Sequence, residues 1–445
     1  MFKETTDKLF SQMPSIGGMR EHLDQRTRGD KYIWGLVILL SLISILVVYS
    51  ATGSLAYKMY RGNTSFYLFK QIIFTLIGLL VVFGLHRVNY TVFSRVATIL
   101  FILSVPLLIY TLFFGAKINE GSRWIKLPII NLTIQSSDVA KLALFMYLSR
   151  VLSKKQEVIK DFKKGFLPVI IPVFIICGLI MPANLSNALL TGASSLLLMF
   201  IGRISLKHIG LTILVAMVPL LIIISVAVAT HKAGKAPVAE VEKPMVAEKS
   251  KIFIRFNTWV SRVQDFIYPN EKEAPYQVQQ SKIAIANGGI FFGLGPGNSH
   301  QRNFLPQAYN DFIYAIIIEE YGLIGGAFII FVYLVFLYRC IRIFRKCPYA
   351  FGAFLALGLS FTLIVQAIAN MAVTVGLVPV TGVTLPLISM GGSSFVFTCC
   401  SIGIILSVAR NVEQLEGNAP EETEIEIPEE AEESESVQNP IPKHA

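Results

Sequence analysis

Three carboxylates stand close together in a segment that is otherwise apolar. The stretch "NDFIYAIIIEEYGLIGG" places Asp311 at its start and Glu319 and Glu320 about two helical turns further along. A charged side chain inside a lipid bilayer is costly and is rare unless it has a partner or a function. At the mouth of a membrane helix Asp311 can be ionised at modest cost and act as a general base. The alternative is that Asp311 caps the helix N-terminus, a role that Asp and Asn both fulfil.

The two glutamates cannot share one partner with Asp311. On a regular helix Glu319 lies about 12 Å and Glu320 about 13.5 Å below Asp311, rotated from it by about 80° and about 180°. We therefore expect Asp311 and Glu319 to face a common polar cavity. Glu320 needs a separate partner or stays protonated.

Two groups of cationic side chains could bind an anionic head group. In "IQSSDVAKLALF", Asp138 and Lys141 are three residues apart, so that they can pair on one face of a helix. In "GSRWIKL", Arg123 stands beside Trp124 and close to Lys126, a composition that suits a phosphate at head-group level. The alternative for Asp138 and Lys141 is an ion pair that only orients its helix.

Two irregular segments complete the candidate site. The glycines of "GLGPGNS" allow left-handed backbone and let N–H groups, with Asn298, approach a phosphate or sugar, although a plain turn would look the same. The second segment, "GLVPVTGVTLPLISMGGSSF", ends with Ser393 and Ser394. Irregular backbone at membrane depth persists only when it is buried in protein or lines a cavity. We expect it beside the carboxylates, although its "GGSS" could simply be a helix-packing face.

The elements that position these residues are transmembrane helices. The chain has 445 residues, 53% of them hydrophobic, and a mean hydropathy of +0.60. Apolar runs of about 20 residues recur, and each can cross a bilayer. The sequence predicts an all-α polytopic membrane protein with ten transmembrane helices and a large extracytoplasmic loop between helices 7 and 8, at about 231–310. The helices are expected at about 32–52, 66–86, 92–114, 136–153, 166–182, 185–202, 208–230, 311–339, 350–374 and 391–410.

Charge fixes the expected orientation. The short connections 149–164, 203–207 and 338–346 are basic, and basic short loops stay in the cytoplasm. A cytoplasmic segment 1–31, a membrane domain 32–410 and a cytoplasmic tail then follow, with both termini inside. The tail holds eleven Glu and one Lys and has no apolar periodicity, so we expect it to be disordered.

The remaining composition excludes several kinds of site. The net charge is +10 although the tail is acidic, and basic cytoplasmic loops explain this better than nucleic-acid binding. The five cysteines lie within or beside apolar runs, which argues against a disulfide framework. Six scattered histidines without an HExxH or CxxC pattern predict no metal site.

Three segments together resemble a known family. "GSRWIKL…IQSSDVAKLAL", "FLPQAYNDFIYAIIIEEYGLIG" and "GLVPVTGVTLPLISMGGSSF" are similar to the shape, elongation, division and sporulation (SEDS) family of ten-span bacterial membrane proteins. The resemblance covers about residues 32–410 in order. "GPGNS" followed by "FLPQAYNDF" is most similar to the cell-division branch of the family, and next to its rod-shape branch.

The resemblance implies a peptidoglycan glycosyltransferase. It would polymerise lipid II into glycan strands on the outer face of the bacterial inner membrane, for septal wall synthesis, with undecaprenyl pyrophosphate as the leaving group. The family's catalytic aspartate falls on Asp311, and its acid–lysine pair on Asp138 and Lys141. Lys and Arg side chains, with or without a divalent cation (Mg²⁺ or Mn²⁺), would stabilise the departing pyrophosphate. Expected partners are a class B penicillin-binding protein, which is a transpeptidase, and other divisome proteins.

One departure from the family pattern stands in "MPANLSNAL". Many members carry an acidic "PDxGT" motif there, whereas this chain has Asn184 and Asn187, which can only hydrogen-bond. Two other functions use the same residues: a flippase for lipid-linked precursors, and a non-catalytic divisome scaffold. The enzyme is favoured because the special residues gather at the expected outer face, whereas a flippase would need comparable polar features on the inner half.

Overall fold

The computed structural model describes most of the chain. The described ranges are 29–53, 65–118, 121–126, 133–232, 251–268 and 276–417. Only the backbone is described for 116–118, 121–126, 232, 251–255 and 416–417. Most of the expected N-terminal segment, the acidic tail beyond Gly417 and the Arg123 side chain lie outside the described residues.

A helix occupies each of the ten predicted ranges. These helices are α3 (Lys31–Ala51), α5 (Ser65–Arg87), α6 (Tyr90–Phe114), α7 (Ser136–Lys154), α8 (Leu167–Ile180), α9 (Leu185–Ile201), α10 (Leu206–Lys232), α13 (Ile313–Lys346), α14 (Ala350–Thr374) and α15 (Ser393–Gly417). Within the described residues, eight helices are long and apolar enough to cross a membrane. The two others, α7 and α9, are more polar or shorter, so the count of ten spans stays a prediction. A multi-pass membrane protein is confirmed.

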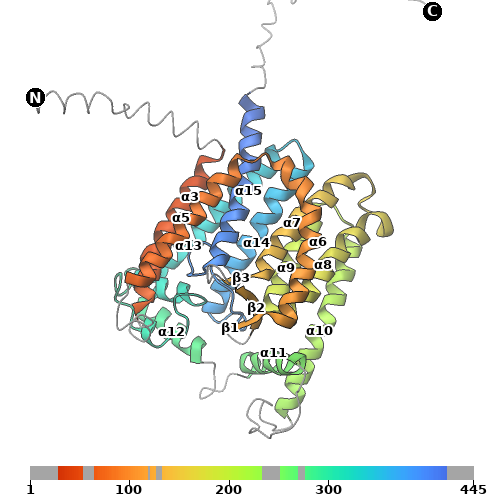
Figure 1. The fold of residues 1–445 in the computed structure, drawn as a ribbon. Coiled ribbons are helices and arrows are strands. Elements are labelled where there is room, and N and C mark those ends of the chain that lie inside the picture. Colours follow the sequence, from red (N-terminus) through yellow and green to blue (C-terminus); the bar gives the residue numbers. More distant parts are fainter. Residues whose placement is uncertain are drawn as a thin grey trace, which may run out of the picture.

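The helices form one bundle with a buried centre (Figure 1). The spanning windows of α14 and α15 are each 72% buried, whereas that of α10 is 17% buried. The outer helices expose large apolar side chains, such as Leu80, Phe113 and Leu214. Because a bilayer solvates such side chains, this surface faces lipid. Both described chain ends lie at one end of the bundle, and α12 (Tyr276–Gly288) lies at the other.

Smaller elements gather at the end of the bundle that holds α12. Helix α12 packs along α13. At the closest approach, a Cβ on Gly288 would lie 2.1 Å from the Ile318 carbonyl oxygen. Two features were not predicted from the sequence. They are α11 (Lys251–Ile267) and a three-stranded antiparallel sheet of β1 (Ala116–Ile118), β2 (Gly121–Lys126) and β3 (Thr133–Gln135).

Helix α13 is broken at Gly322, where φ is 73° and ψ is −180°. A side chain at this left-handed position would be strained, and its Cβ would lie 3.1 Å from the carbonyl oxygens of Ile290 and Phe291. The break lets the loop after α12 pack directly against the helix backbone. The prediction of a regular helix through this region was therefore wrong, because the loop supplies an alternative set of backbone partners.

The expected orientation can be measured by cysteine labelling. His300 is exposed at the end of the bundle that holds α12, and Glu157 is exposed in the basic connection 149–164. Because basic short loops stay in the cytoplasm, a cysteine replacing His300 should react with a membrane-impermeant maleimide in cells with a permeabilised outer membrane. A cysteine replacing Glu157 should react only after the inner membrane is disrupted. The chain without an added cysteine is the control, and the reverse labelling pattern would contradict the orientation.

Candidate functional site

Asp311 lies just before α13 rather than inside it. The helix begins at Ile313, its N-cap is Phe312, and no side chain caps it. The N-cap alternative for Asp311 is therefore not what the structure shows. The Asp311 backbone oxygen accepts a 2.7 Å hydrogen bond from the Asn370 side-chain amide of α14. A Cβ on Gly382, whose φ is 64°, would lie 3.6 Å from Asp311 Oδ2, so the carboxylate sits against a stretch of backbone that has no side chain.

That backbone belongs to the irregular segment before α15, which is fastened beside Asp311. Asn370 Nδ2 donates to the backbone oxygen of Val383 at 2.7 Å, and Ser389 Oγ donates to the backbone oxygen of Asn310 at 2.6 Å. Further side-chain donors to the segment are Gln366, Tyr333 and Ser44, which bond to the carbonyl oxygens of Thr384, Pro386 and Ile388. The irregular backbone therefore lies next to Asp311, which confirms the expectation for this carboxylate but not for Glu319 and Glu320.

Tyr309 is a neighbour of Asp311 that the sequence analysis missed. Burial, and then the negative charge of Asp311, raise the pKa of the Tyr309 phenol above its usual value. The phenol therefore stays protonated at neutral pH and keeps its proton for hydrogen bonding. The Met390 N–H donates to the backbone carbonyl oxygen of Tyr309 at 3.0 Å, which ties this residue to the same irregular segment.

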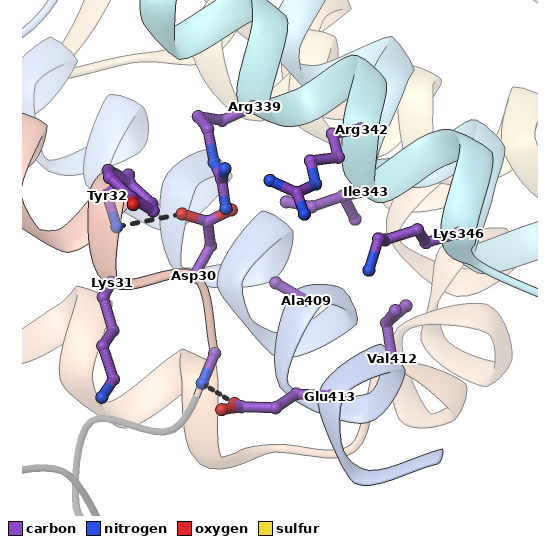
Figure 2. A pocket seen from close by; sticks show the side chains of 11 residues that line it. Asp30, Lys31, Tyr32, Arg339, Arg342, Ile343, Lys346, Ala409, Val412 and Glu413 are labelled. Atoms are coloured by element: carbon purple, nitrogen blue, oxygen red, sulfur yellow. Dashed lines mark hydrogen bonds and ion pairs between the residues drawn. The ribbon is translucent and has the colours of Figure 1, made fainter. Parts of the chain in front are cut away.

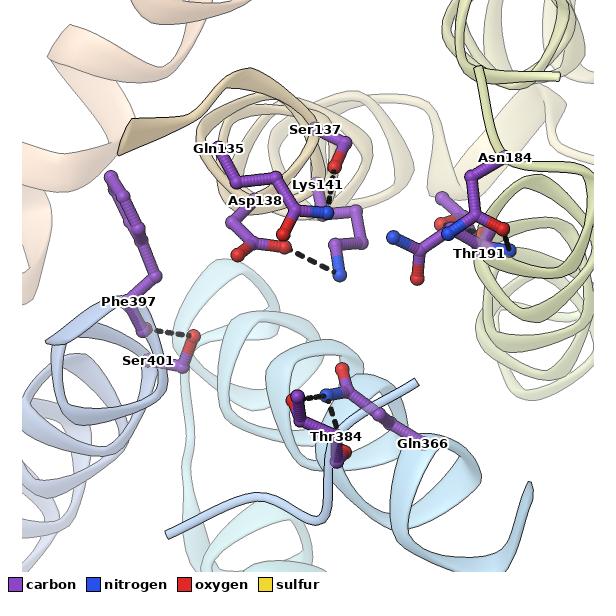
Figure 3. Close-up of polar contacts among 11 residues, drawn as sticks. Gln135, Ser137, Asp138, Lys141, Asn184, Thr191, Gln366, Thr384, Phe397 and Ser401 are labelled. Atoms are coloured by element: carbon purple, nitrogen blue, oxygen red, sulfur yellow. Dashed lines mark hydrogen bonds and ion pairs between the residues drawn. The ribbon is translucent and has the colours of Figure 1, made fainter. Parts of the chain in front are cut away.

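Asp138 and Lys141 form the second part of the site. Lys141 Nζ lies 2.9 Å from Asp138 Oδ1, and both side chains are almost buried. The other carboxylate oxygen of Asp138 is buried and has no hydrogen-bond partner within the described residues. The pair lines a small pocket of about 30 Å³ together with Gln366, Ser394, Thr398 and Ser401. Binding of an anionic head group by Lys141 stays a prediction. Figure 3 shows Lys141 pointing from α7 into the space between α14 and α9.

Helix α14 connects the two parts. Asn370 bonds to the Asp311 backbone, and Gln366, one turn earlier, bonds to Thr384 and lines the Lys141 pocket. Residues four apart lie on one face of a helix, so α14 presents a single polar edge to both parts. Gln366 and Asn370 were not singled out from the sequence. Two amides four apart in the apolar run of α14 were the available signal.

The other predicted site residues divide into two groups. Ser394 lines the Lys141 pocket, and Ser393 beside it is buried, with its hydroxyl lacking a partner within the described residues. Arg123 lies on β2, which pairs with β3 immediately before α7, but its side chain is outside the described residues. Asn298 is exposed, and its amide bonds to the Leu294 oxygen of its own turn at 3.1 Å. The plain-turn interpretation therefore describes Asn298, and a role in substrate binding stays a prediction.

Asn184 and Asn187 stand at the start of α9. Asn184 Oδ1 accepts from the Asn187 backbone N–H at 3.2 Å and so caps the helix. Its amide nitrogen, Nδ2, is buried and has no partner within the described residues. Asn184 lies across from Lys141 in Figure 3. At this position the chain thus presents an amide donor, whereas a carboxylate would only accept.

Glu319 does not face a cavity with Asp311, which corrects the expectation from helix geometry. Its side chain is fully buried and accepts hydrogen bonds from the last turn of α12 and from the loop that follows it. Asn287 Nδ2 donates at 3.2 Å, the Gln301 N–H donates at 3.2 Å, and the Ser299 hydroxyl also donates. The carboxylate therefore fastens the loop that leads to Asp311. Sequence spacing placed Glu319 on the correct helix but could not show that a loop covers it.

Glu320 has the separate partner that the helix geometry required. The Ser50 hydroxyl of α3 donates to Glu320 Oε1, while Oε2 is buried without a partner within the described residues. Arg302 Nη1 donates to the backbone carbonyl oxygen of Ser50 at 3.3 Å and adds a positive charge nearby. Glu320 thus connects α13 to α3 and does not line the candidate site.

Glu319→Gln is expected to loosen the loop more than Glu320→Gln. The NH₂ group of the introduced amide would face Asn287, Ser299 and Gln301, which all donate hydrogen bonds to the native carboxylate, so that donors would face one another. Hydrogen bonds to a charged group contribute about 1.5–3 kcal/mol each, so their loss should destabilise the loop. The rate of limited proteolysis within 287–302 should rise strongly for Glu319→Gln and little for Glu320→Gln. Equal protection in both variants, at equal amounts of folded protein, would show that the carboxylate does not hold the loop.

Comparison with known proteins gives the family. A sequence profile described as "Cell cycle protein", of FtsW, RodA and SpoVE, matches residues 30–414. A protein named probable peptidoglycan glycosyltransferase FtsW from Trichlorobacter lovleyi is 33% identical over 84% of this chain and 91% of its own length. Stage V sporulation protein E of Bacillus subtilis is 31% identical over 87% of this chain and 98% of its own length.

Solved structures agree in fold. A chain from a study of polymerisation and crosslinking by a peptidoglycan synthase complex has a TM-score of 0.63 at 24% identity, over 87% of this chain and 99% of that one. The rod-shape-determining protein RodA of Thermus thermophilus has a TM-score of 0.58 at 20% identity, over 86% of this chain and 97% of that one. The match of profile, relatives and fold over nearly the whole membrane domain shows that this chain belongs to the family of FtsW, RodA and stage V sporulation protein E.

Proposed function

We propose that this protein polymerises lipid II into glycan strands, as a peptidoglycan glycosyltransferase of the cytoplasmic membrane. The single observation that supports this most is the arrangement around α14. A carboxylate at the mouth of α13 and a lysine pocket are held by the same polar edge of one helix. Relatives named probable peptidoglycan glycosyltransferase support the same assignment.

Asp311 is the proposed general base. Strand growth requires a sugar hydroxyl to attack an anomeric carbon, and a carboxylate at the membrane surface can take the hydroxyl proton. Asp311 suits this role because its carboxylate stands just before the start of α13, beside the backbone of Gly382. One carboxylate is enough, because a pyrophosphate leaving group needs little protonation.

Lys141, with Arg123, is proposed to stabilise the departing undecaprenyl pyrophosphate. Fixed cations in a site that excludes water stabilise charge that develops in the transition state. Asp138 orients the Lys141 ammonium through their 2.9 Å ion pair. No three His, Cys, Asp or Glu side chains among the described residues gather to hold a metal. The proposal assigns stabilisation of the pyrophosphate to Lys141 and Arg123, with or without a Mg²⁺ or Mn²⁺ ion.

The finer assignments are proposals as well. Septal wall synthesis is supported by relatives named FtsW, and a class B penicillin-binding protein as partner by the likeness to a chain of a peptidoglycan synthase complex. Strand synthesis from purified lipid II in detergent separates the enzyme from a flippase and from a scaffold, because detergent removes any need for translocation. Absence of strands from folded protein with its transpeptidase would overturn the proposal.

Asp311→Asn is expected to abolish most of the activity. The amide keeps the size of the side chain but cannot accept the hydroxyl proton, so the rate of strand synthesis should fall by roughly 10²–10⁴-fold. The measurement compares glycan strands formed by the wild type and the variant at equal amounts of folded protein. Asn310→Asp with Asp311→Asn, which moves the carboxylate by one residue, is a matched control and should stay inactive. Near-wild-type synthesis by Asp311→Asn would remove Asp311 as the general base.

Lys141→Ala is expected to slow the same reaction by about 10²-fold, because one fixed cation near the leaving group is lost. Lys154→Ala on the same helix removes the same charge at an exposed position and should have little effect. Thermal unfolding of both variants shows whether the loss reflects folding. If Lys154→Ala slowed synthesis as much as Lys141→Ala, the pocket would have no special role.

A further inference from the structure

A second hollow lies at the opposite end of the bundle from Asp311. It forms where the start of α3 and the ends of α13 and α15 meet, and it encloses about 240 Å³ (Figure 2). Four basic and two acidic side chains line it. They are Lys31, Arg339, Arg342, Lys346, Asp30 and Glu413.

Both acidic side chains of the hollow are engaged by the protein itself. Asp30 Oδ2 lies 2.6 Å from Arg339 Nη2, and Asp30 Oδ1 accepts the N–H groups of Tyr32 and Ile33 at the start of α3. The Arg339 guanidinium lies 4.3 Å from the centre of the Tyr32 ring, and Glu413 accepts the Gly29 N–H. These contacts hold the wall in place before any ligand arrives.

The other two basic side chains of α13 are directed into the hollow. Arg342 and Lys346 are one turn apart, and Figure 2 shows both extending toward the space above Ala409 and Val412. Within the described residues the Arg342 guanidinium makes no hydrogen bond or ion pair. Basic residues are common at helix C-termini, where the helix dipole favours them. The dipole alone does not explain why Arg342 and Lys346 line one hollow. A guanidinium and an ammonium side by side are a combination that suits phosphate.

Nearby aromatic residues place the hollow at the membrane surface. Tyr32 is 64% exposed and Tyr338 is 61% exposed, both at the end of the bundle that holds the hollow. Exposed tyrosines at the ends of apolar helices mark the level of lipid head groups. Basic pockets between helices at this level bind anionic head groups. The geometry points to a binding site for the phosphate of an anionic phospholipid, contacted by Arg342 and Lys346.

Binding can be measured on the full-length protein in detergent, without any assay of strand synthesis. A ligand that binds the folded state raises its thermal stability with concentration, so titration with short-chain phosphatidylglycerol gives an apparent affinity. Arg342→Gln should weaken it by about fivefold, and Arg342→Gln with Lys346→Gln by about 25-fold. Arg345→Gln is the matched control, because it removes the same charge from the same helix but does not line this hollow. It should change the affinity by less than about twofold.

Three outcomes would overturn the proposal. Equal losses of affinity for Arg342→Gln and Arg345→Gln would show that the lipid is attracted by the general positive charge of the surface and not by this hollow. Equal binding of phosphatidylcholine, or of free glycerol phosphate, would exclude an anionic lipid as the specific source of the phosphate. Phosphatidylglycerol that bound only to a chain truncated after Gly417 would show that the acidic tail occupies the hollow. The unliganded unfolding temperature of each variant verifies folding, and the result does not depend on the proposed enzyme activity.

Discussion

The break in α13 at Gly322 is the constraint on which the candidate site depends. An unbroken helix would pair the N–H groups of residues 323 and 324 with the carbonyls of residues 319 and 320. Instead, Leu323 N bonds to the Gly289 oxygen at 3.1 Å and Ile324 N to the Ile290 oxygen at 3.3 Å. The released carbonyls accept from Leu294 and Gly295 at 2.9 and 3.0 Å. Both interrupted helical hydrogen bonds are thus replaced by bonds to one loop, as a buried backbone requires.

The same loop explains why Glu319 is tolerated in an apolar helix. The Glu319 carboxylate reaches the same loop through Ser299 and Gln301, and the end of α12 through Asn287, so its burial is compensated by hydrogen bonds. The loop that these bonds fix continues directly to Asp311. A buried carboxylate therefore sets the position of the carboxylate that is proposed to act, although the two do not share a cavity.

Helix α14 positions the second part of the site, the pocket that contains Asp138 and Lys141. Its amides hold the irregular segment against Asp311 and line the pocket of Lys141. Amide side chains suit this position because they donate without adding charge to the most buried part of the bundle. Asn184 is likewise a buried amide without charge: its oxygen caps α9, and its NH₂ group is a neutral donor.

The sequence by itself determined the helices and the residues worth testing. Bilayer hydrocarbon offers no hydrogen-bond partners, so every span must be an apolar helix, and local hydropathy locates it. Helical rotation also set Glu320 apart from Asp311, with a partner of its own or a proton as the two alternatives. Only the tertiary structure decided which partners these are: Ser50 lies 270 positions from Glu320, and Asn370 lies 59 positions from Asp311. The break at Gly322 and the covering of Glu319 escaped prediction for the same reason, because periodicity reports which face of a helix a residue occupies and not what packs against that face.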